Sequence, residues 1–173
     1  GPIFNFILAW VFSVILIFMT GYDEPVVGAV EEGYPAYEAG LRPGDRITEM
    51  GGKNIHIFRE ISAYLQFHPG ENVSLTYERD GKETSVTLAP EYDEELGYAR
   101  VGLGSAGYTR ADLLSAFSYG TYEVKYWIQV TIDSLRMLVT GQIGVDQLSG
   151  PVGIVDVVDD AYQQSRSYGV LVV

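Results

Sequence analysis

The chain has 173 residues, enough for one globular domain with further segments attached. It contains no cysteine, which excludes a disulfide framework and a zinc site built from thiolates. The formal net charge is −12, from 23 acidic residues against 11 Lys and Arg, and this argues against nucleic acid as a partner, because phosphate binding needs clustered Lys and Arg.

The first predicted element is a transmembrane helix over residues 1–22. No residue before Asp23 is charged, and residues 3–19 are almost wholly apolar. A bilayer core about 30 Å thick needs roughly 20 residues of helix, which this segment provides. A signal peptide fits poorly, because there is no initiating Met and no basic leading region. A buried helix of a soluble core is the other alternative. The Gly-Pro start indicates a piece of a longer protein or a processing scar.

Short elements and turns follow. We expect strands over 25–30 and 46–50, separated by a short helix over 35–39. Gly40 suits a left-handed helix cap, and Pro43-Gly44 suits a type II turn with Gly where φ is positive.

The next stretch predicts a helix and a hairpin. Apolar residues at 58, 61 and 65 have a helical period, so a helix is expected over 58–67. Alternating runs over 73–78 and 84–88 flank Asp80-Gly81, which is a strong hairpin signal. An acidic loop over 90–97 and a strand over 98–103 complete this part.

The run AGLRPGDRI at residues 39–47 resembles the PDZ domains of bacterial proteases. The resemblance implies an α+β fold over 25–104, a small β-barrel or sandwich with two helices. The glycine-rich segment Val101-Gly102-Leu103-Gly104 comes last in this region, which resembles the circularly permuted form of the bacterial domains. Such a domain binds peptides and cuts nothing.

A peptide-binding groove is the site that this resemblance implies. Backbone N–H groups of a glycine-rich segment would hold a peptide carboxylate, and the extended peptide would lie between strand 98–103 and helix 58–67. The expected peptide-binding residues are Val101, Gly102, Leu103, Gly104, Phe58, Ile61 and Leu65.

The remainder is predicted to be helical. Thr109 is expected to cap a helix over 111–118 that Gly120 ends. A second, amphipathic helix over 122–139 places Lys125, Gln129, Asp133 and Arg136 on one stripe, with Val124, Trp127, Ile128, Leu135 and Leu138 opposite. Lying in a membrane interface and packing on a soluble core both remain open for this helix.

Residues 108–164 are therefore expected to form a membrane-associated helical region. A helix over 151–164 would carry Asp156, Asp159 and Asp160, but only two of these share a stripe, so a metal site is not expected there. Residues 165–173 are predicted to begin a further membrane helix that is cut off.

Taken in order, these elements resemble the RseP-type site-2 proteases, bacterial intramembrane zinc metalloproteases, and cover essentially the whole chain. The most specific similarities lie at the apolar helix and after the PDZ-like region. The motif residues are Gly1, Pro2 and Asn5, and Ser149, Gly150 and Pro151 within 148–154. Asn5 is expected to hydrogen-bond across helices, since a buried amide in lipid needs a partner; an Asn reached by water at the membrane face is the alternative.

The family's chemistry needs zinc, a His-Glu-x-x-His helix and a later Asp ligand. Neither His56 nor His68 belongs to such a motif, and both are expected to be ordinary turn or surface residues. The resemblance thus implies the middle of a zinc endopeptidase for regulated intramembrane proteolysis, with the zinc ligands outside this chain. This segment is expected to bind no zinc and to be inactive alone.

The resemblance also implies a bacterial cell-membrane location with the PDZ-like domain on the extracytoplasmic side. Expected partners are the membrane itself and transmembrane protein substrates or peptide carboxyl termini, which the domain would bind or filter. The alternative is a membrane-anchored PDZ adaptor without catalysis. A serine protease with a PDZ domain is not supported, because nothing here resembles its catalytic domain.

Overall fold

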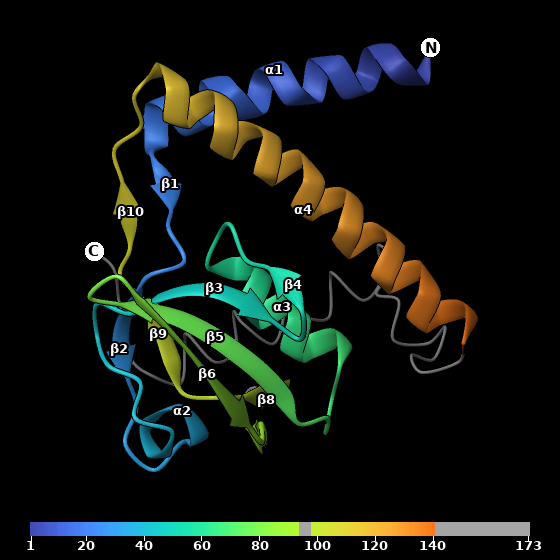
Figure 1. Cartoon of the computed structure of the whole chain (residues 1–173). Helices are drawn as coiled ribbons and strands as arrows, with labels where there is room; N and C mark the ends of the chain where they lie inside the picture. The colour runs from blue at the N-terminus through green and yellow to red at the C-terminus, as the bar shows by residue number, and fades with distance from the viewer. Residues whose placement is uncertain (94–97, 141–173) are drawn as a thin grey trace, which may run out of the picture. The chain divides into compact units, whose positions relative to one another are not determined.

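The computed structural model describes residues 1–93 and 98–140 (Figure 1). The predictions for 148–154, 151–164 and 165–173 lie outside the described residues. The helices are α1 (Pro2–Thr20), α2 (Pro35–Glu38), α3 (Arg59–Phe67) and α4 (Leu113–Val139). The strands are β1 (Tyr22–Asp23), β2 (Val27–Val30), β3 (Arg46–Met50), β4 (Lys53–Asn54), β5 (Val73–Arg79), β6 (Lys82–Leu88), β7 (Glu91–Asp93), β8 (Tyr98–Arg100), β9 (Leu103–Ser105) and β10 (Tyr108–Thr109).

A four-stranded antiparallel sheet in the order β4-β3-β5-β6 forms the centre of the β-rich domain between β1 and β10. Three two-stranded pairs, β2-β9, β7-β8 and β1-β10, complete it. The alternation predicted for β5 is confirmed, because Val73, Leu75 and Tyr77 are buried while the residues between them are not. These side chains join Ile47, Met50, Ile61, Leu65, Leu88 and Val101 in one hydrophobic core.

The predicted turn between α2 and β3 is also confirmed. Gly44 has φ +97°, and the Asp45 N–H donates to the Arg42 carbonyl at 3.2 Å, as a turn with Gly at its third position requires. The buried Asp45 carboxylate accepts the Arg42 N–H at 2.8 Å and two bonds from Arg79, at 2.6 and 2.7 Å. One side chain therefore ties this turn to β5.

Two predictions for the following segment are wrong in detail. The acidic stretch begins with a strand, β7, rather than being a loop throughout, and β7 pairs with β8. The strand expected over 98–103 is divided into β8 and β9, because the chain turns at Gly102 with φ +78°. The division lets β8 pair with β7 and β9 pair with β2.

The prediction of two helices divided at Gly120 is wrong, because α4 runs without a break from Leu113 to Val139. Gly120 is buried against α1, where an added Cβ would lie 2.7 Å from Val14 Cγ2 and 2.9 Å from its Cα. The glycine therefore permits close helix packing instead of ending the helix. The predicted cap is also replaced, since the Asp112 carboxylate accepts the Ser115 N–H at 2.7 Å.

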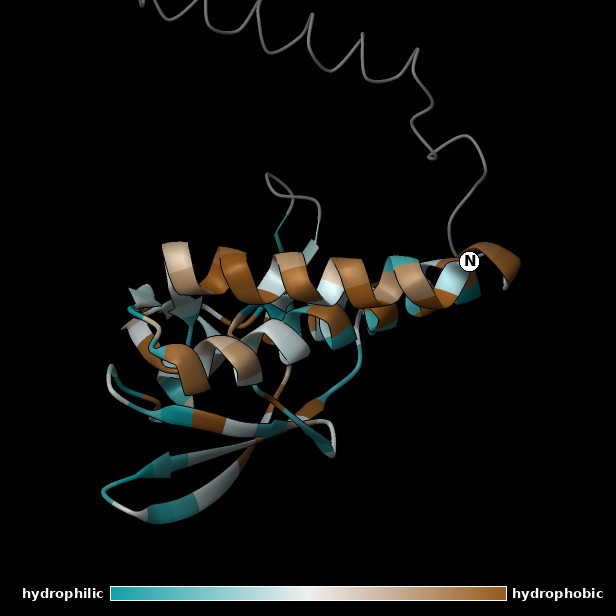
Figure 2. Ribbon diagram, turned by 90° about the horizontal axis from the view of Figure 1, so that it is seen from above, coloured by the Kyte–Doolittle hydropathy of each residue, from teal (hydrophilic) through white to brown (hydrophobic). Residues whose placement is uncertain are grey.

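The apolar surface of α1 is exposed, and Ile17 is its one buried residue. Within the described part of the chain, α1 is the helix whose length and composition would allow it to cross a membrane. The alternative of a buried helix in a soluble core is contradicted by side chains such as Phe4 and Phe12, which are 64% and 61% exposed. Figure 2 shows the hydrophobic bands along the helices.

Residues Gly1–Asp133 form one compact unit. Within this unit, α1 and the start of α4 are in contact. The indole N–H of Trp10 donates to the Thr121 hydroxyl at 3.0 Å, and its ring meets Phe117 edge-on at 4.7 Å. Closer to the β-rich domain, Tyr22 stacks on Tyr119 at 3.8 Å.

Candidate functional site

A hollow of about 190 Å³ lies between α3 and the chain from β8 to β9. Six of the seven residues expected to bind a peptide line it, and Gly104 does not. Gly104 instead lies in β9 opposite Ala29 of β2. The lining residues are Phe58, Ile61, Ser62, Leu65, Tyr98, Ala99, Arg100, Val101, Gly102 and Leu103. We call this hollow the groove.

The sequence places α3 along the groove through its helical period. Ile61 and Leu65 are one turn apart, and both are buried toward the core. The Glu60 carboxylate accepts the backbone N–H groups of His56 at 2.6 Å and Ile57 at 3.2 Å. A carboxylate in the first turn also faces the positive end of the helix dipole, so the start of α3 is well defined.

The opposite wall of the groove presents backbone N–H groups. The Val101 carbonyl accepts the Ala36 N–H at 3.0 Å, and the Gly102 carbonyl accepts the Glu31 N–H at 2.9 Å. In a trans peptide the C=O and the following N–H point in opposite directions. The N–H groups of Gly102 and Leu103 therefore point away from α2 and β2. Two neighbouring N–H donors in this arrangement suit an anionic oxygen ligand.

The segment before these donors is held by charge pairs. Arg100 bonds to Asp93 at 3.0 Å and to Glu31, and its guanidinium lies 4.8 Å from the ring centre of Tyr34. Tyr34 also packs on Gly102, where an added Cβ would lie 2.3 Å from the tyrosine Cβ. Only glycine fits between this ring and the turn at positive φ.

The strand β8 pairs with β7 along one edge, and the groove separates β8 from α3. An extended peptide placed in the groove would therefore run beside a strand, with apolar side chains on the helix side. Chemically, the groove offers backbone donors at one end and an apolar lining from Phe58, Ile61 and Leu65.

The opposite side of α3 faces α4, which the sequence patterns did not reveal. Arg59 forms an ion pair with Glu123 of α4, and its guanidinium lies 5.5 Å from the ring centre of Tyr126. Burial raises the pKa of the Glu123 carboxyl, although the charge of Arg59 acts in the other direction. The signal in the sequence was a Glu that lies outside the polar stripe of this amphipathic helix.

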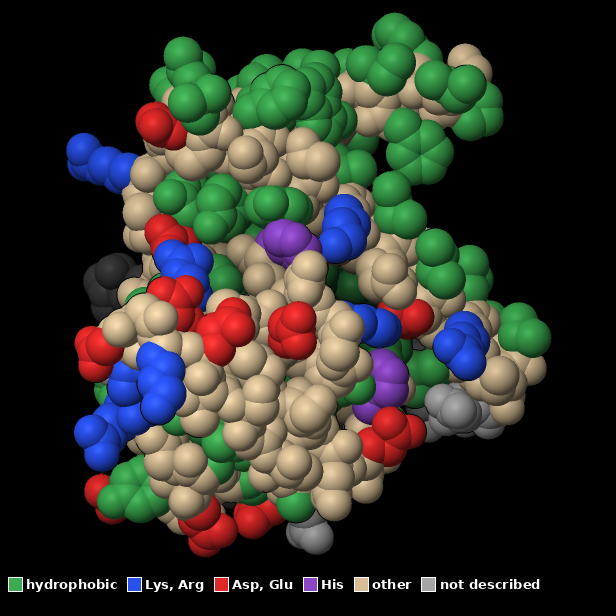
Figure 3. All heavy atoms as spheres, viewed as in Figure 1, with side chains coloured by type: hydrophobic (Ala, Val, Ile, Leu, Met, Phe, Trp, Pro, Cys, Tyr) green, Lys and Arg blue, Asp and Glu red, His purple; other side chains and the backbone are tan. Residues whose placement is uncertain are grey.

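The amphipathic pattern of α4 is confirmed, but its polar side faces the β-rich domain. Lys125, Gln129 and Asp133 line a cavity against α3, whereas Trp127 and Ile132 are more than half exposed. Figure 3 shows hydrophobic side chains gathered over α1 and α4 and charged ones spread over the β-rich domain. Packing of the apolar face on a soluble core is therefore contradicted for this part of α4.

Both histidines are structural residues at the ends of α3. His56 lies in the loop before α3 and is half-buried, with its ring centre 4.1 Å from that of Tyr122. The ring N–H of His68 donates to the Tyr64 carbonyl at 2.8 Å. In the described ranges, no three His, Cys, Asp or Glu side chains gather in a way that fits zinc.

The motif residues predicted at the start of the chain lie on α1. The Gly1 carbonyl accepts the N–H of Phe4 at 3.0 Å, and Pro2 occupies the first helical turn. The Asn5 side chain is exposed on the surface of α1. Ser149, Gly150 and Pro151 lie outside the described residues.

Comparison with known proteins agrees with this architecture. A family model described as "PDZ domain" matches residues 26–79. A zinc metalloprotease RasP of Geobacillus kaustophilus is 36% identical over 89% of this chain and 37% of its own length. The regulator of sigma-W protease RasP of Bacillus subtilis is 35% identical over 92% of this chain and 38% of its own length.

Among solved structures, the PDZ domain of an SdrC-like protein of Listeria innocua is similar. It is 25% identical over 51% of this chain and 100% of its own length, with a TM-score of 0.44. The chain thus spans less than two fifths of the RasP relatives named above.

Proposed function

We propose that this chain is the central segment of a membrane-embedded zinc metalloprotease of the site-2 protease family, because it is 36% and 35% identical to two RasP proteases over about nine tenths of its length. The parent protein would carry out regulated intramembrane proteolysis. By the order of segments in the family it resembles, it would hold zinc with ligands from segments flanking residues 1–173, since neither His56 nor His68 belongs to a His-Glu-x-x-His motif. Zinc would provide a Lewis acid and an activated water.

We propose that α1 crosses the bacterial cell membrane and that the PDZ domain lies on its extracytoplasmic side. An uncharged helix of 19 residues with exposed Phe, Ile and Leu side chains supports the first part. The contact at Gly120 and Val14 would then bring the start of α4 to the membrane as well. The side of the membrane is a proposal from the family resemblance alone.

We propose that the groove binds a peptide carboxyl terminus and thereby selects substrates for the parent protease. The observation that carries this proposal is the pair of N–H groups at Gly102 and Leu103, directed away from α2 and β2 beside an apolar lining. The carboxylate would accept these N–H groups, and an apolar terminal side chain would contact Ile61 and Leu65. Charge-assisted hydrogen bonds of this kind are among the stronger ones in proteins.

The test is peptide binding to the full chain in phospholipid nanodiscs, followed by fluorescence anisotropy. Labelled decapeptides ending in Val, Leu or Phe should bind with a free carboxylate and lose at least about 1.5 kcal/mol, roughly tenfold in affinity, when amidated. Equal binding of both forms would contradict a carboxylate site.

A glycine pair provides the matched variants. Gly102→Ala should weaken binding, because its Cβ would displace Tyr34 and move the turn. Gly52→Ala is the control, since Gly52 has a similar φ of +75° but no atom within 4 Å of an added Cβ. Similar affinity in the two variants would count against the proposed groove.

The membrane-anchored adaptor without catalysis is the alternative function. Reading the gene on both sides decides between them, because a His-Glu-x-x-His motif in an apolar segment upstream and an Asp in an apolar segment downstream are required for the protease. If both are lacking, the adaptor stands. This segment alone should not cleave a membrane protein, and zinc-dependent cleavage by it would refute the placement of the metal ligands elsewhere.

A further inference from the structure

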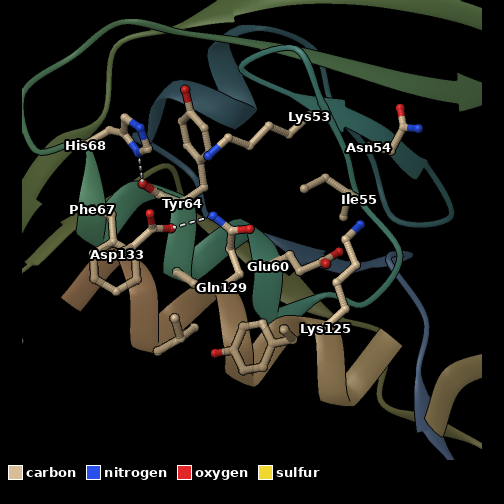
Figure 4. Close-up of a pocket in the computed structure, with 13 residues that line it drawn as sticks. Lys53, Asn54, Ile55, Glu60, Tyr64, Phe67, His68, Lys125, Gln129 and Asp133 are labelled. Atoms are coloured by element: carbon tan, nitrogen blue, oxygen red, sulfur yellow. Dashed lines mark hydrogen bonds between the residues drawn. The ribbon is translucent and has the colours of Figure 1, made fainter. Parts of the chain in front are cut away.

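Helix α3 separates the groove from a second cavity. Ile61 and Leu65 face the groove, whereas Ala63 and Phe67 face a cavity of about 230 Å³ on the other side of the helix (Figure 4). At 100° per residue the two sets lie on opposite faces of the helix. Helix α4 forms the opposite side of this cavity, so α3 lies between the groove and the cavity.

The two ends of α3 are held differently. At its start, Arg59 is ion-paired with Glu123, and the ring of His56 lies 4.1 Å from that of Tyr122. Toward its end, Phe67 lines the cavity together with Asp133 of α4 (Figure 4). The first turn is therefore anchored to α4, and the second half has space behind it.

The groove is small for a peptide. Its volume of about 190 Å³ is below the roughly 300–1,000 Å³ of ordinary ligand sites. Ile61, Leu65 and Val101 on its two walls are nearly fully buried. An apolar terminal residue with its backbone therefore needs one wall to move.

The wall made by β8 and β9 is the less movable one. It is paired with β7 and β2, and Arg100 is bonded to both Asp93 and Glu31. The cavity lies behind the other wall. Because packed interiors resist compression, a helix moves most easily toward unfilled space.

We propose that α3 is a hinged wall of the groove, anchored at Arg59–Glu123, whose second half swings into the cavity when a peptide enters. This inference rests on the proposed function of the groove in peptide binding. The cavity is bounded by α4, so this movement brings α3 against α4. Because α4 also packs on α1, peptide binding in the groove is coupled to the helix that contacts α1. If peptide binding requires α3 to occupy the cavity, then a side chain that fills the cavity must weaken peptide binding, because the two events are thermodynamically linked.

The first experiment fills the cavity in the full chain. Ala63→Phe places a phenyl ring in the cavity from α3, and Val130→Phe places one there from α4. If one of the two variants does not fold, the other still tests the hinge. Each should weaken binding of the carboxyl-terminal peptides about tenfold, inside the roughly 5- to 150-fold range of coupled sites. The control is Gln66→Phe, an exposed position on α3 that lines neither space.

The second experiment detects the movement itself. The chain has no cysteine, so Ala63→Cys with Val130→Cys creates a unique pair across the cavity. Peptides with a free carboxylate should speed disulfide formation several-fold, and amidated peptides should not. An unchanged or slower rate would overturn the hinge, even if the filled variants bind weakly.

The two proposals fail differently. If the unmodified chain binds none of the peptides, peptide binding by the groove is wrong and the hinge with it. If the unmodified chain binds peptides and both phenylalanine variants of the cavity bind equally well, only the hinge is wrong.

Discussion

Replacing Asp45 by alanine should destabilise the PDZ domain by about 2 kcal/mol. The carboxylate is 1% exposed and accepts the Arg42 N–H as well as two bonds from Arg79. A hydrogen bond to a charged group contributes about 1.5–3 kcal/mol, but bonds to one side chain do not add. Arg79 is partly exposed and regains water, so its share is discounted and the bond within the turn dominates.

The assay is thermal unfolding of the full chain in detergent, followed by circular dichroism at pH 7. For a domain of this size 1 kcal/mol corresponds to roughly 4–8 °C, so Tm should fall by about 8–16 °C. Asp80→Asn is the control, because it removes the same charge beside Arg79 at an exposed turn residue whose φ of +52° Asn tolerates. A Tm for Asp45→Ala within about 2 °C of the unmodified chain would refute the reasoning.

The same carboxylate predicts a pH dependence. Burial alone would raise the pKa of Asp45, but the hydrogen bonds from Arg79 and the Arg42 N–H outweigh it and lower the pKa. A lowered pKa means that the stabilisation is complete above the ordinary Asp value of about 3.9 and is lost as pH falls through the lowered value. The difference in Tm between the unmodified chain and Asp45→Asn should therefore be constant from about pH 7 to 5 and shrink below about pH 4. A difference already shrinking at pH 6 would contradict this assignment.

Two further predictions concern the contacts of α4. Gly120→Ala gains about 0.5–1 kcal/mol of helix propensity but overpacks against α1 at a cost of about 1–3 kcal/mol, so the helices should separate. In a Trp127→Phe background the emission spectrum of Trp10 should then change, because its indole loses the Thr121 hydroxyl and the Phe117 ring, and an unchanged spectrum would contradict the contact. Arg59→Leu leaves the Glu123 carboxylate buried without its partner, and burial already raises the pKa of that group. The variant should therefore lose more stability at pH 8 than at pH 5 in thermal unfolding, and an equal loss at both would count against a buried ion pair.

The elements that could be predicted from the sequence are those decided by neighbouring residues. The turn at Pro43-Gly44 follows from a fixed proline φ and a glycine that tolerates positive φ. The hairpin at Asp80-Gly81 and the alternation in β5 follow in the same way from local geometry. Helix α3 was found within one residue of its observed start, because its apolar period is regular.

The helix break predicted at Gly120 is wrong because it was inferred from neighbouring residues alone. Gly120 has the lowest helix propensity of any residue except proline, and a break was a sound expectation. The structure continues the helix because the backbone of Val14, more than a hundred residues earlier, packs on that glycine. No pattern within residues 113–139 contains this information.

The groove was predicted in outline and its surroundings were not. Family resemblance placed Val101, Gly102 and Leu103 opposite Phe58, Ile61 and Leu65, and all six line one hollow. The anchor at Arg59 and Glu123 and the cavity behind α3 were missed, because a helical period reveals two faces without showing what lies against each.

By itself, the sequence determined the uncharged apolar helix, the turns and strands of the PDZ domain and the similarity to RasP zinc metalloproteases, since these depend on composition, spacing and backbone constraints. Tertiary structure decided the continuity of α4, the direction of its polar side and the space behind α3. Those features depend on contacts between residues far apart in the chain, whose energies exist only once the elements are packed together.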